Sequence, residues 1–157
     1  MILEKLGVLS TAQDLLAGTT DSENVIDLGA VANVGLNEVY LSIETETVES
    51  GADTDTYVID LVLATEATLD TYYKILSIVM TGADPRLATA GRAIANCEIG
   101  HMLGELLDGS YRYLGLMSTL ANVGGTAAVS INAALSPSKP ATKLNTQVVR
   151  SNVTVPS

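Results

Sequence analysis

The amino-acid sequence predicts an all-β protein in which short antiparallel strands form a sandwich or barrel. Apolar and polar residues alternate through several short stretches, and this period of two is typical of strands with one buried face. Segments rich in Gly, Asp, Asn, Ser and Pro separate these stretches at close spacing, as turns do in all-β domains. Helical periodicity is weak throughout, so an antiparallel β architecture is favoured.

The first predicted strands lie in residues 23–29 and 38–45. Residues 23–29 contain a short apolar run that is expected to end at Gly29. Residues 38–45 alternate strictly, with an apolar face and a polar face, and predict a half-buried strand. The apolar face of this second strand is formed by Val39, Leu41 and Ile43.

Three longer stretches complete the expected sheet. Residues 56–64 place Tyr57, Ile59, Leu61 and Leu63 on one face, and their β-branched content favours a strand. Residues 72–80 are apolar on both faces, which predicts a central strand or one covered by a partner. A turn of helix within residues 64–76 is the alternative there, although the threonine content disfavours it. Residues 126–135 alternate again and turn inward the side chains of Ala127, Val129, Ile131, Ala133 and Leu135.

Composition restricts the classes of function. The 157 residues suffice for one domain with a sizeable core, and 47% of them are hydrophobic although Phe and Trp are absent. The net charge is −10, and this acidic excess argues against nucleic acid as a partner, because phosphate binding relies on clustered Lys and Arg. A high apolar content beside a strong charge predicts an apolar patch that a partner covers, and hence a homodimer or homotrimer.

Charge is distributed unevenly along the chain. Residues 1–135 hold all 18 acidic residues and five basic ones, a balance of −13, whereas residues 136–157 hold three basic residues and no acidic one. The segment 136–157 also contains several prolines, so we expect an extended basic arm carrying Lys139, Lys143 and Arg150. Such an arm suits docking on an acidic neighbour or pairing with the edge of its sheet.

No pattern in the chain predicts an enzyme or a cofactor site. The single cysteine excludes an intrachain disulfide and suggests a reducing compartment of synthesis, and no signal peptide or membrane-length apolar run is recognisable. Cys97 and His101 stand four residues apart, but in a strand they would be roughly 13 Å apart, too far to form a thiol–imidazole pair. The acidic segment 44–55 is interpreted as a solvated hairpin tip, since it lacks calcium-loop spacing; a cation site there is left open.

The clearest candidate for a contact surface is the stretch 110–116, "SYRYLGL". Alternation predicts that Tyr111 and Tyr113 share one face while Arg112 shares the other with two leucines. Tyr and Arg are enriched at protein interfaces, because Tyr combines a large apolar ring with a polar tip. The alternative is a sheet face with tyrosine hydroxyls at the rim of the core. The predicted interface residues are therefore Tyr111, Arg112, Tyr113, Lys139, Lys143 and Arg150.

Four segments resemble, in the same order, the capsid cement (decoration) proteins of tailed bacteriophages, in particular the family of the Bordetella phage cement protein. These segments are "MILEKLGVLSTAQ", "NVIDLG", "RYLGL" and "GTAAVSINAAL". The resemblance implies a jelly-roll-like β-sandwich over residues 1–135 that sits on the outer capsid surface as a homo-oligomer and clamps neighbouring major capsid subunits. It also implies synthesis in the bacterial host cytoplasm. The basic arm of residues 136–157 departs from the family pattern.

Two functions of different classes follow from the sequence. The first is a virion cement protein whose partners are the major capsid protein and further copies of itself, without nucleic acid or membrane. The second is a carbohydrate- or receptor-binding β-sandwich from a phage fibre or surface protein. The scarcity of aromatic residues, only 4% of the chain, disfavours sugar binding.

Overall fold

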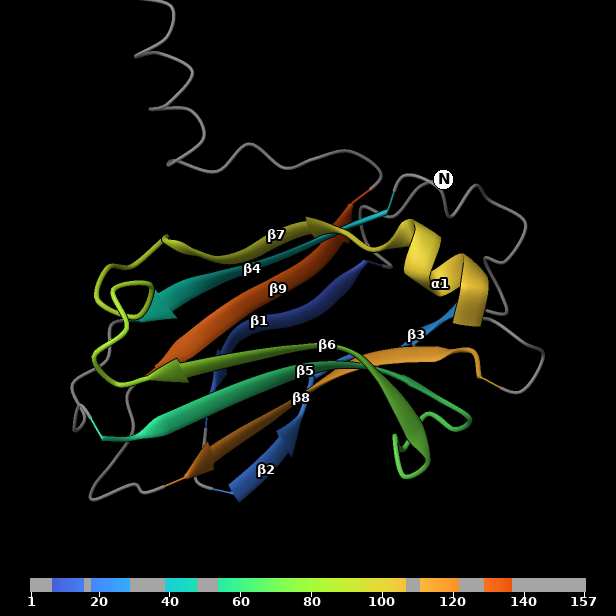
Figure 1. Ribbon diagram of the computed structural model, residues 1–157, viewed down its shortest axis with the longest axis horizontal. Helices are drawn as coiled ribbons and strands as arrows, with labels where there is room; N and C mark the ends of the chain where they lie inside the picture. Colours follow the sequence, from blue (N-terminus) through green and yellow to red (C-terminus); the bar gives the residue numbers. More distant parts are fainter. Residues whose placement is uncertain are drawn as a thin grey trace, which may run out of the picture.

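The computed structural model describes residues 7–15, 18–28, 39–47, 54–106, 111–121 and 129–136. Strands fill most of these residues, and a short helix lies between two of the strands (Figure 1). The first five strands are β1 (Val8–Asp14), β2 (Gly18–Asp21), β3 (Ile26–Asp27), β4 (Tyr40–Thr47) and β5 (Thr56–Ala64). The remaining elements are β6 (Tyr72–Thr81), β7 (Ala93–Glu98), α1 (Gly100–Leu106), β8 (Tyr113–Ala121) and β9 (Ser130–Ser136).

The strands form two antiparallel sheets that face each other. The first sheet has the order β1-β9-β4-β7, and the second has the order β2-β8-β5-β6, with β3 pairing beside β2 on β8. The antiparallel partners are nested in the sequence, since β5 pairs with β6, β4 with β7, β2 with β8 and β1 with β9. A long hairpin rolled into two facing sheets has this pairing, which is the jelly-roll arrangement. The predicted all-β, jelly-roll-like sandwich is therefore confirmed.

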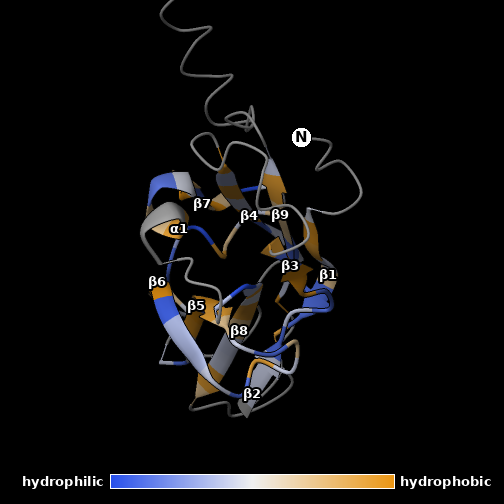
Figure 2. Cartoon of the chain, turned by 90° about the vertical axis from the view of Figure 1, so that its right-hand side faces the viewer, coloured by the Kyte–Doolittle hydropathy of each residue, from blue (hydrophilic) through white to orange (hydrophobic). Residues whose placement is uncertain are grey.

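The core lies between the two sheets and is built by alternation along the strands (Figure 2). Val39, Leu41 and Ile43 are buried in and beside β4, as their spacing predicts. The inward row of β5 is buried too, because β5 is flanked by β6 and β8 and has no free edge. The inward side chains of residues 129–135 are buried as expected, and Ala127 lies outside the described residues.

A second, smaller cluster covers part of the outer face of the second sheet. Val62 and Ala64 point away from the main core, yet both are fully buried, because the loop after β5 folds back and lays Leu69 over them. Leu69 has a φ of 57°, in the left-handed region that non-glycine residues seldom adopt. Gly115 of β8 leaves room for it, since a Cβ there would lie 2.7 Å from Leu69 Cδ1.

Several sequence predictions need correction. Residues 64–76 form no helix; they contain the end of β5, a turn and the start of β6. The strand at 72–80 is not central, because β6 is the last strand of its sheet among the described residues. Cys97 and His101 do not share a strand, since residues 100–106 form the helix α1, which is anchored by the buried Leu103. The strand expected at 23–29 shrinks to the two residues of β3, and Gly29 lies outside the described part.

Candidate interaction surface

The predicted interface stretch around Arg112 is divided between two sides of the second sheet. Tyr111 lies before β8 begins and packs against the main core, where its ring contacts that of Tyr73 with centroids 4.6 Å apart. Tyr113 is the first residue of β8 and packs with the outer cluster around Leu69. The expectation that Tyr111 and Tyr113 share a face is therefore wrong, because strand alternation starts only at Tyr113.

Arg112 is held in place by its neighbours. Its Nη2 lies 2.7 Å from Asp27 Oδ2, and its guanidinium carbon lies 5.1 Å from the centre of the Tyr113 ring. The ion pair joins the short strand β3 to β8, beside the register pair Asp27–Tyr113. Arg112 thus has a local structural role. Of the predicted interface stretch, Tyr111 is the residue that we consider further as part of a contact surface. The other predicted interface residues, Lys139, Lys143 and Arg150, lie outside the described residues.

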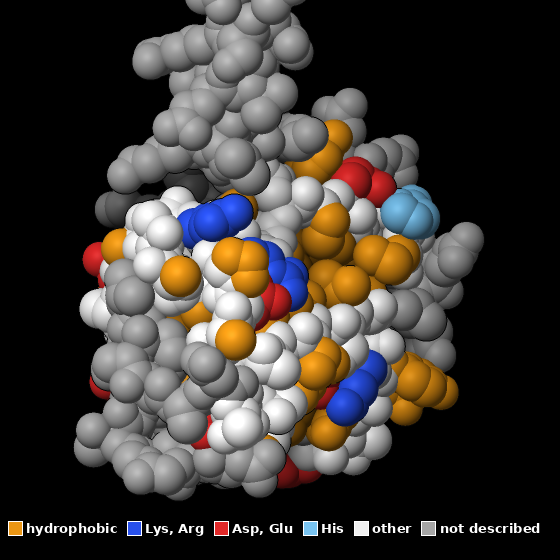
Figure 3. Space-filling model, turned by 60° about the vertical axis from the view of Figure 1, so that its left-hand side comes forward, with side chains coloured by type: hydrophobic (Ala, Val, Ile, Leu, Met, Phe, Trp, Pro, Cys, Tyr) orange, Lys and Arg blue, Asp and Glu red, His pale blue; other side chains and the backbone are white. Residues whose placement is uncertain are grey.

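Tyr111 belongs to an apolar seam along one side of the sandwich. β6 and β7 are edge strands of the two sheets and lie on the same side of the molecule (Figure 2). In the described part of the chain, the partly buried apolar side chains that pack against the main core come from β6, β7, α1 and Tyr111. They are Ile75, Leu76, Ile78, Ala95, Cys97, Met102 and Tyr111. We call this set the β6/β7 edge; along it the core reaches the surface (Figure 3).

β6 itself carries the most exposed large apolar side chains among the described residues. Val79 of β6 is 62% exposed and Tyr73 is 53% exposed. Lys74 is the one charged residue of β6, and its Nζ lies 2.7 Å from Asp60 Oδ2. Ser77 Oγ donates a second hydrogen bond to Asp60 at 2.6 Å, so this buried carboxylate is paired. The hydrogen bond with Asp60 raises the pKa of Lys74. β6 is thus nearly neutral on a strongly acidic chain.

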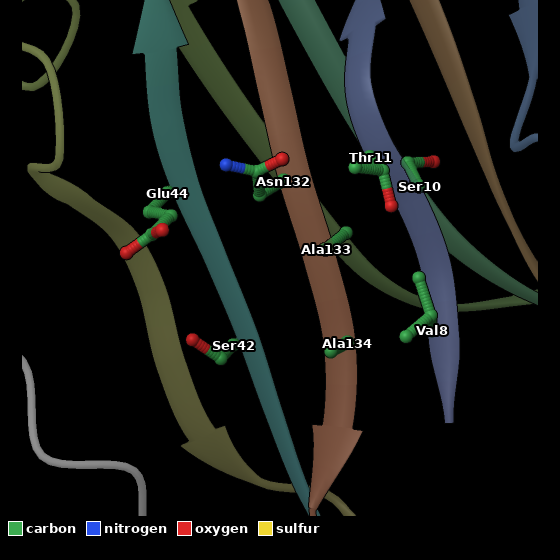
Figure 4. A pocket seen from close by; sticks show the side chains of 8 residues that line it. All are labelled: Val8, Ser10, Thr11, Ser42, Glu44, Asn132, Ala133 and Ala134. Carbon is green, nitrogen blue, oxygen red and sulfur yellow. The ribbon is translucent and has the colours of Figure 1, made fainter. Parts of the chain in front are cut away.

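A second surface feature is a shallow hollow on the outer face of the first sheet (Figure 4). It measures about 230 Å³, and it is lined by Val8, Ser10, Thr11, Ser42, Glu44, Asn132, Ala133 and Ala134. The Asn132 amide is already engaged: its Oδ1 accepts from the Ala12 N–H at 2.7 Å, and its Nδ2 donates to Glu46 Oε2 at 2.6 Å. Small-molecule sites usually measure about 300–1,000 Å³, and several free polar groups point into them. The hollow is smaller than this range, and small side chains form part of its lining.

The two residues considered for chemistry, Cys97 and His101, lie in different elements, β7 and α1. Cys97 faces the core from β7 and is half-buried, and desolvation, aided by the charge of Glu98, raises the pKa of its thiol. His101 is exposed on α1, with its Nδ1 2.5 Å from Glu98 Oε2, and this contact lowers the pKa of Glu98. Raising a thiol pKa disfavours the reactive thiolate.

The acidic segment 44–55 is only partly described. Glu44 and Glu46 belong to β4, Asp55 is buried at the start of β5, and residues 48–53 lie outside the described part. Over the described ranges, His, Cys, Asp and Glu side chains form no group of three or more that could hold a metal ion. In the same ranges no helix has the length and apolar character needed to cross a membrane.

Comparison with known proteins gives no family assignment. No family model matches the chain, and no curated protein matches it.

The connection between β6 and β7 is fixed by a carboxylate whose pH response can be measured. Asp84 Oδ1 accepts from Arg86 N at 2.9 Å and from Nε at 3.0 Å, and its Oδ2 accepts from Nη2 at 2.8 Å. The Thr45 hydroxyl also donates to the Arg86 carbonyl, which ties this connection to β4. The hydrogen bond from Arg86 holds the pKa of Asp84 below its ordinary value of 3.8.

Replacing Asp84 with Asn is expected to lower the free energy of unfolding at pH 7 by about 1 kcal/mol, allowing for partial solvent screening of the pair. A carboxyl whose pKa is depressed in the folded state stabilises the fold above its unfolded pKa, and this contribution is lost as pH falls through the folded value. The difference in the free energy of unfolding between wild type and D84N should therefore shrink below about pH 3.8. Urea denaturation of both proteins from pH 7 to pH 2.5 measures this difference. The exposed Glu66→Gln variant is the control, and an equal loss for both variants would contradict the prediction.

Proposed function

We propose that this chain is a capsid cement protein, which binds the outer surface of a tailed-phage shell and clamps neighbouring major capsid subunits. The observation that carries the proposal is the position of the four resembling segments in the fold. The segments 1–13 and 125–135 contribute β1 and β9, which pair with each other. The segments 24–29 and 112–116 contribute β3 and the start of β8, which also pair. The resembling segments thus form strands that pair with each other. A jelly roll, which the resemblance implies, would contain such pairs.

The surface suits such a role. A decoration protein acts in many copies, so modest contacts at each copy add up to firm attachment. Such a protein binds through accessible apolar side chains and through the backbone groups of edge strands. The β6/β7 edge supplies both.

The decisive experiment is co-sedimentation of the purified chain with empty shells of a tailed phage that encodes it. The full chain is expected to pellet with the shells, and a chain lacking residues 137–157 is expected to pellet less while its melting temperature stays nearly unchanged. The reason is that the basic arm would lie on a neighbour, held by backbone pairing and guided by charge, since exposed ion pairs contribute only about 0–1 kcal/mol each.

A full-length variant with Lys139, Lys143 and Arg150 all changed to Gln separates these two contributions. It should lose less binding than the truncated chain, and its loss should depend on salt. Failure of the full chain to pellet would contradict the cement function. A truncated chain that does not fold would contradict the arm, because residues 137–157 would then complete the sandwich.

The second candidate, a carbohydrate- or receptor-binding domain, is favoured by one observation. The Tyr73 and Tyr111 rings meet at the surface, and Tyr73 is exposed enough to stack on a sugar. A glycan array discriminates between the candidates. Glycan binding that the Tyr73→Ala variant loses, together with absence from the shell pellet, would favour this second function.

A further inference from the structure

Among the described strands, four end the two sheets, and β6 differs from the other three. A free edge exposes unpaired N–H and C=O groups, and proteins usually protect it by short length, irregularity or charge. β2 has four residues, and β7 has six, shifts its register against β4 at Ile94 and ends at Glu98. β1 carries two register shifts and a left-handed Ala12 with φ 48°, and its Thr11 N–H is bound by Glu23 Oε2 at 2.9 Å.

β6 has ten residues and little of this protection. A bulge leaves Ile75 without a register partner on β5, and Lys74, just before it, is paired with Asp60. From residue 76 to residue 81 the strand is regular, uncharged and free of proline. Val79, the most exposed large apolar residue described, lies in this half. A regular, uncharged and largely apolar edge of this kind favours pairing with another strand.

Charge selects the occupant of this edge. Each copy of the chain carries a net charge of −10, so two copies repel over most of their surfaces. Lys74 and Asp60 neutralise each other, which makes β6 a surface on which two like-charged copies can meet at little electrostatic cost. An acidic segment of another protein would gain no charge attraction there, and neither would the basic arm of residues 137–157.

We propose that β6 of one copy pairs antiparallel with β6 of a second copy across a two-fold axis, which joins the two β2-β8-β5-β6 sheets into one continuous sheet. An antiparallel strand edge is complementary to itself under two-fold rotation, because each residue's donor and acceptor meet those of its counterpart. The apolar side chains of the β6/β7 edge would lie along the joint. This pairing selects a dimer over the trimer, which the sequence left open, and it does not depend on the capsid proposal.

Sedimentation velocity on the purified full chain tests the dimer directly. Between about 1 and 100 µM in physiological salt, the wild type is expected to sediment as a dimer. The Val79→Lys variant places a charge at the joint in both copies and is expected to raise the dissociation constant at least tenfold, which corresponds to about 1.4 kcal/mol.

Thr19→Lys is the matched control. Thr19, Thr119, Val58 and Val79 form one cross-strand row, so Thr19 stands at the opposite edge of the same sheet and is also exposed. The Thr19→Lys variant adds the same charge as Val79→Lys and should leave the dissociation constant of the dimer unchanged. Far-UV circular dichroism of both variants checks that they are folded.

Hydrogen exchange identifies the strand. Amides of residues 76–81 that face away from β5 should exchange slowly in the wild type and at least tenfold faster in the V79K monomer. A wild-type chain that stays monomeric at 100 µM would overturn the proposal, and so would equal weakening by V79K and T19K. If the full chain is monomeric and deletion of 137–157 speeds exchange in β6, the occupant is the chain's own arm and the proposal is wrong.

Discussion

Replacing Leu61 with alanine is expected to lower the free energy of unfolding by about 2–5 kcal/mol, the usual cost of emptying a rigid core site. Leu61 is fully buried and points into the main core from β5. Both edges of β5 are paired, with Leu61 opposite Leu76 on β6 and opposite Leu116 on β8. Because the strand is held on both sides, it cannot move inward to fill the cavity.

Urea denaturation measures this loss, and a melting temperature lower by roughly 2–4 °C per kcal/mol should accompany it. Val58→Ala is the control, since Val58 lies on the same strand but faces outward and is only half-buried. Its loss should be about 1 kcal/mol or less. If the two variants lose equal stability, the inward and outward faces of β5 are assigned wrongly. Both variants should be compared at one protein concentration, because self-association adds to apparent stability.

Replacing Gly115 with valine is expected to destabilise the wild-type chain by about 2–3 kcal/mol, in the range for overpacking a filled site. The new Cβ would lie 2.7 Å from Leu69 Cδ1 and 3.2 Å from Cδ2, so Leu69 must leave its place. The Leu69 side chain has little space to move into, since it is only 2% exposed. Its backbone is also held, because its N–H donates to the Glu66 carbonyl at 3.1 Å and its φ is already left-handed. Its displacement uncovers Val62 and Ala64.

The same substitution should change sign when Leu69 is first shortened. In a Leu69→Ala background the valine occupies the vacated space and gains β propensity over glycine, so G115V should be neutral or stabilising by up to about 1 kcal/mol. A double-mutant cycle by urea denaturation gives the coupling between the two sites. Equal costs of G115V in both backgrounds would show that the outer cluster does not depend on this contact.

Alternation in the sequence was sufficient to determine which residues of β4, β5 and β9 are inward. The side-chain period of a strand is two, so Leu41, Ile59 and Ile131 can be assigned to one buried face without knowledge of their partners. The same signal predicted the antiparallel sandwich. It could not separate Tyr111 from Tyr113, because alternation applies only inside a strand and β8 begins at Tyr113.

Long-range packing determines where each strand stands in its sheet and what covers its outer face. An apolar strand such as 72–81 has the same pattern at a sheet edge as at its centre, and the nested pairing of the jelly roll places β6 at the edge. The helix at 100–106 forms despite its glycines because burying Leu103 outweighs their weak helix propensity. Local sequence determined the faces of the strands, since that choice depends on adjacent residues. Long-range contacts determined the edges, since those depend on segments that only folding brings together.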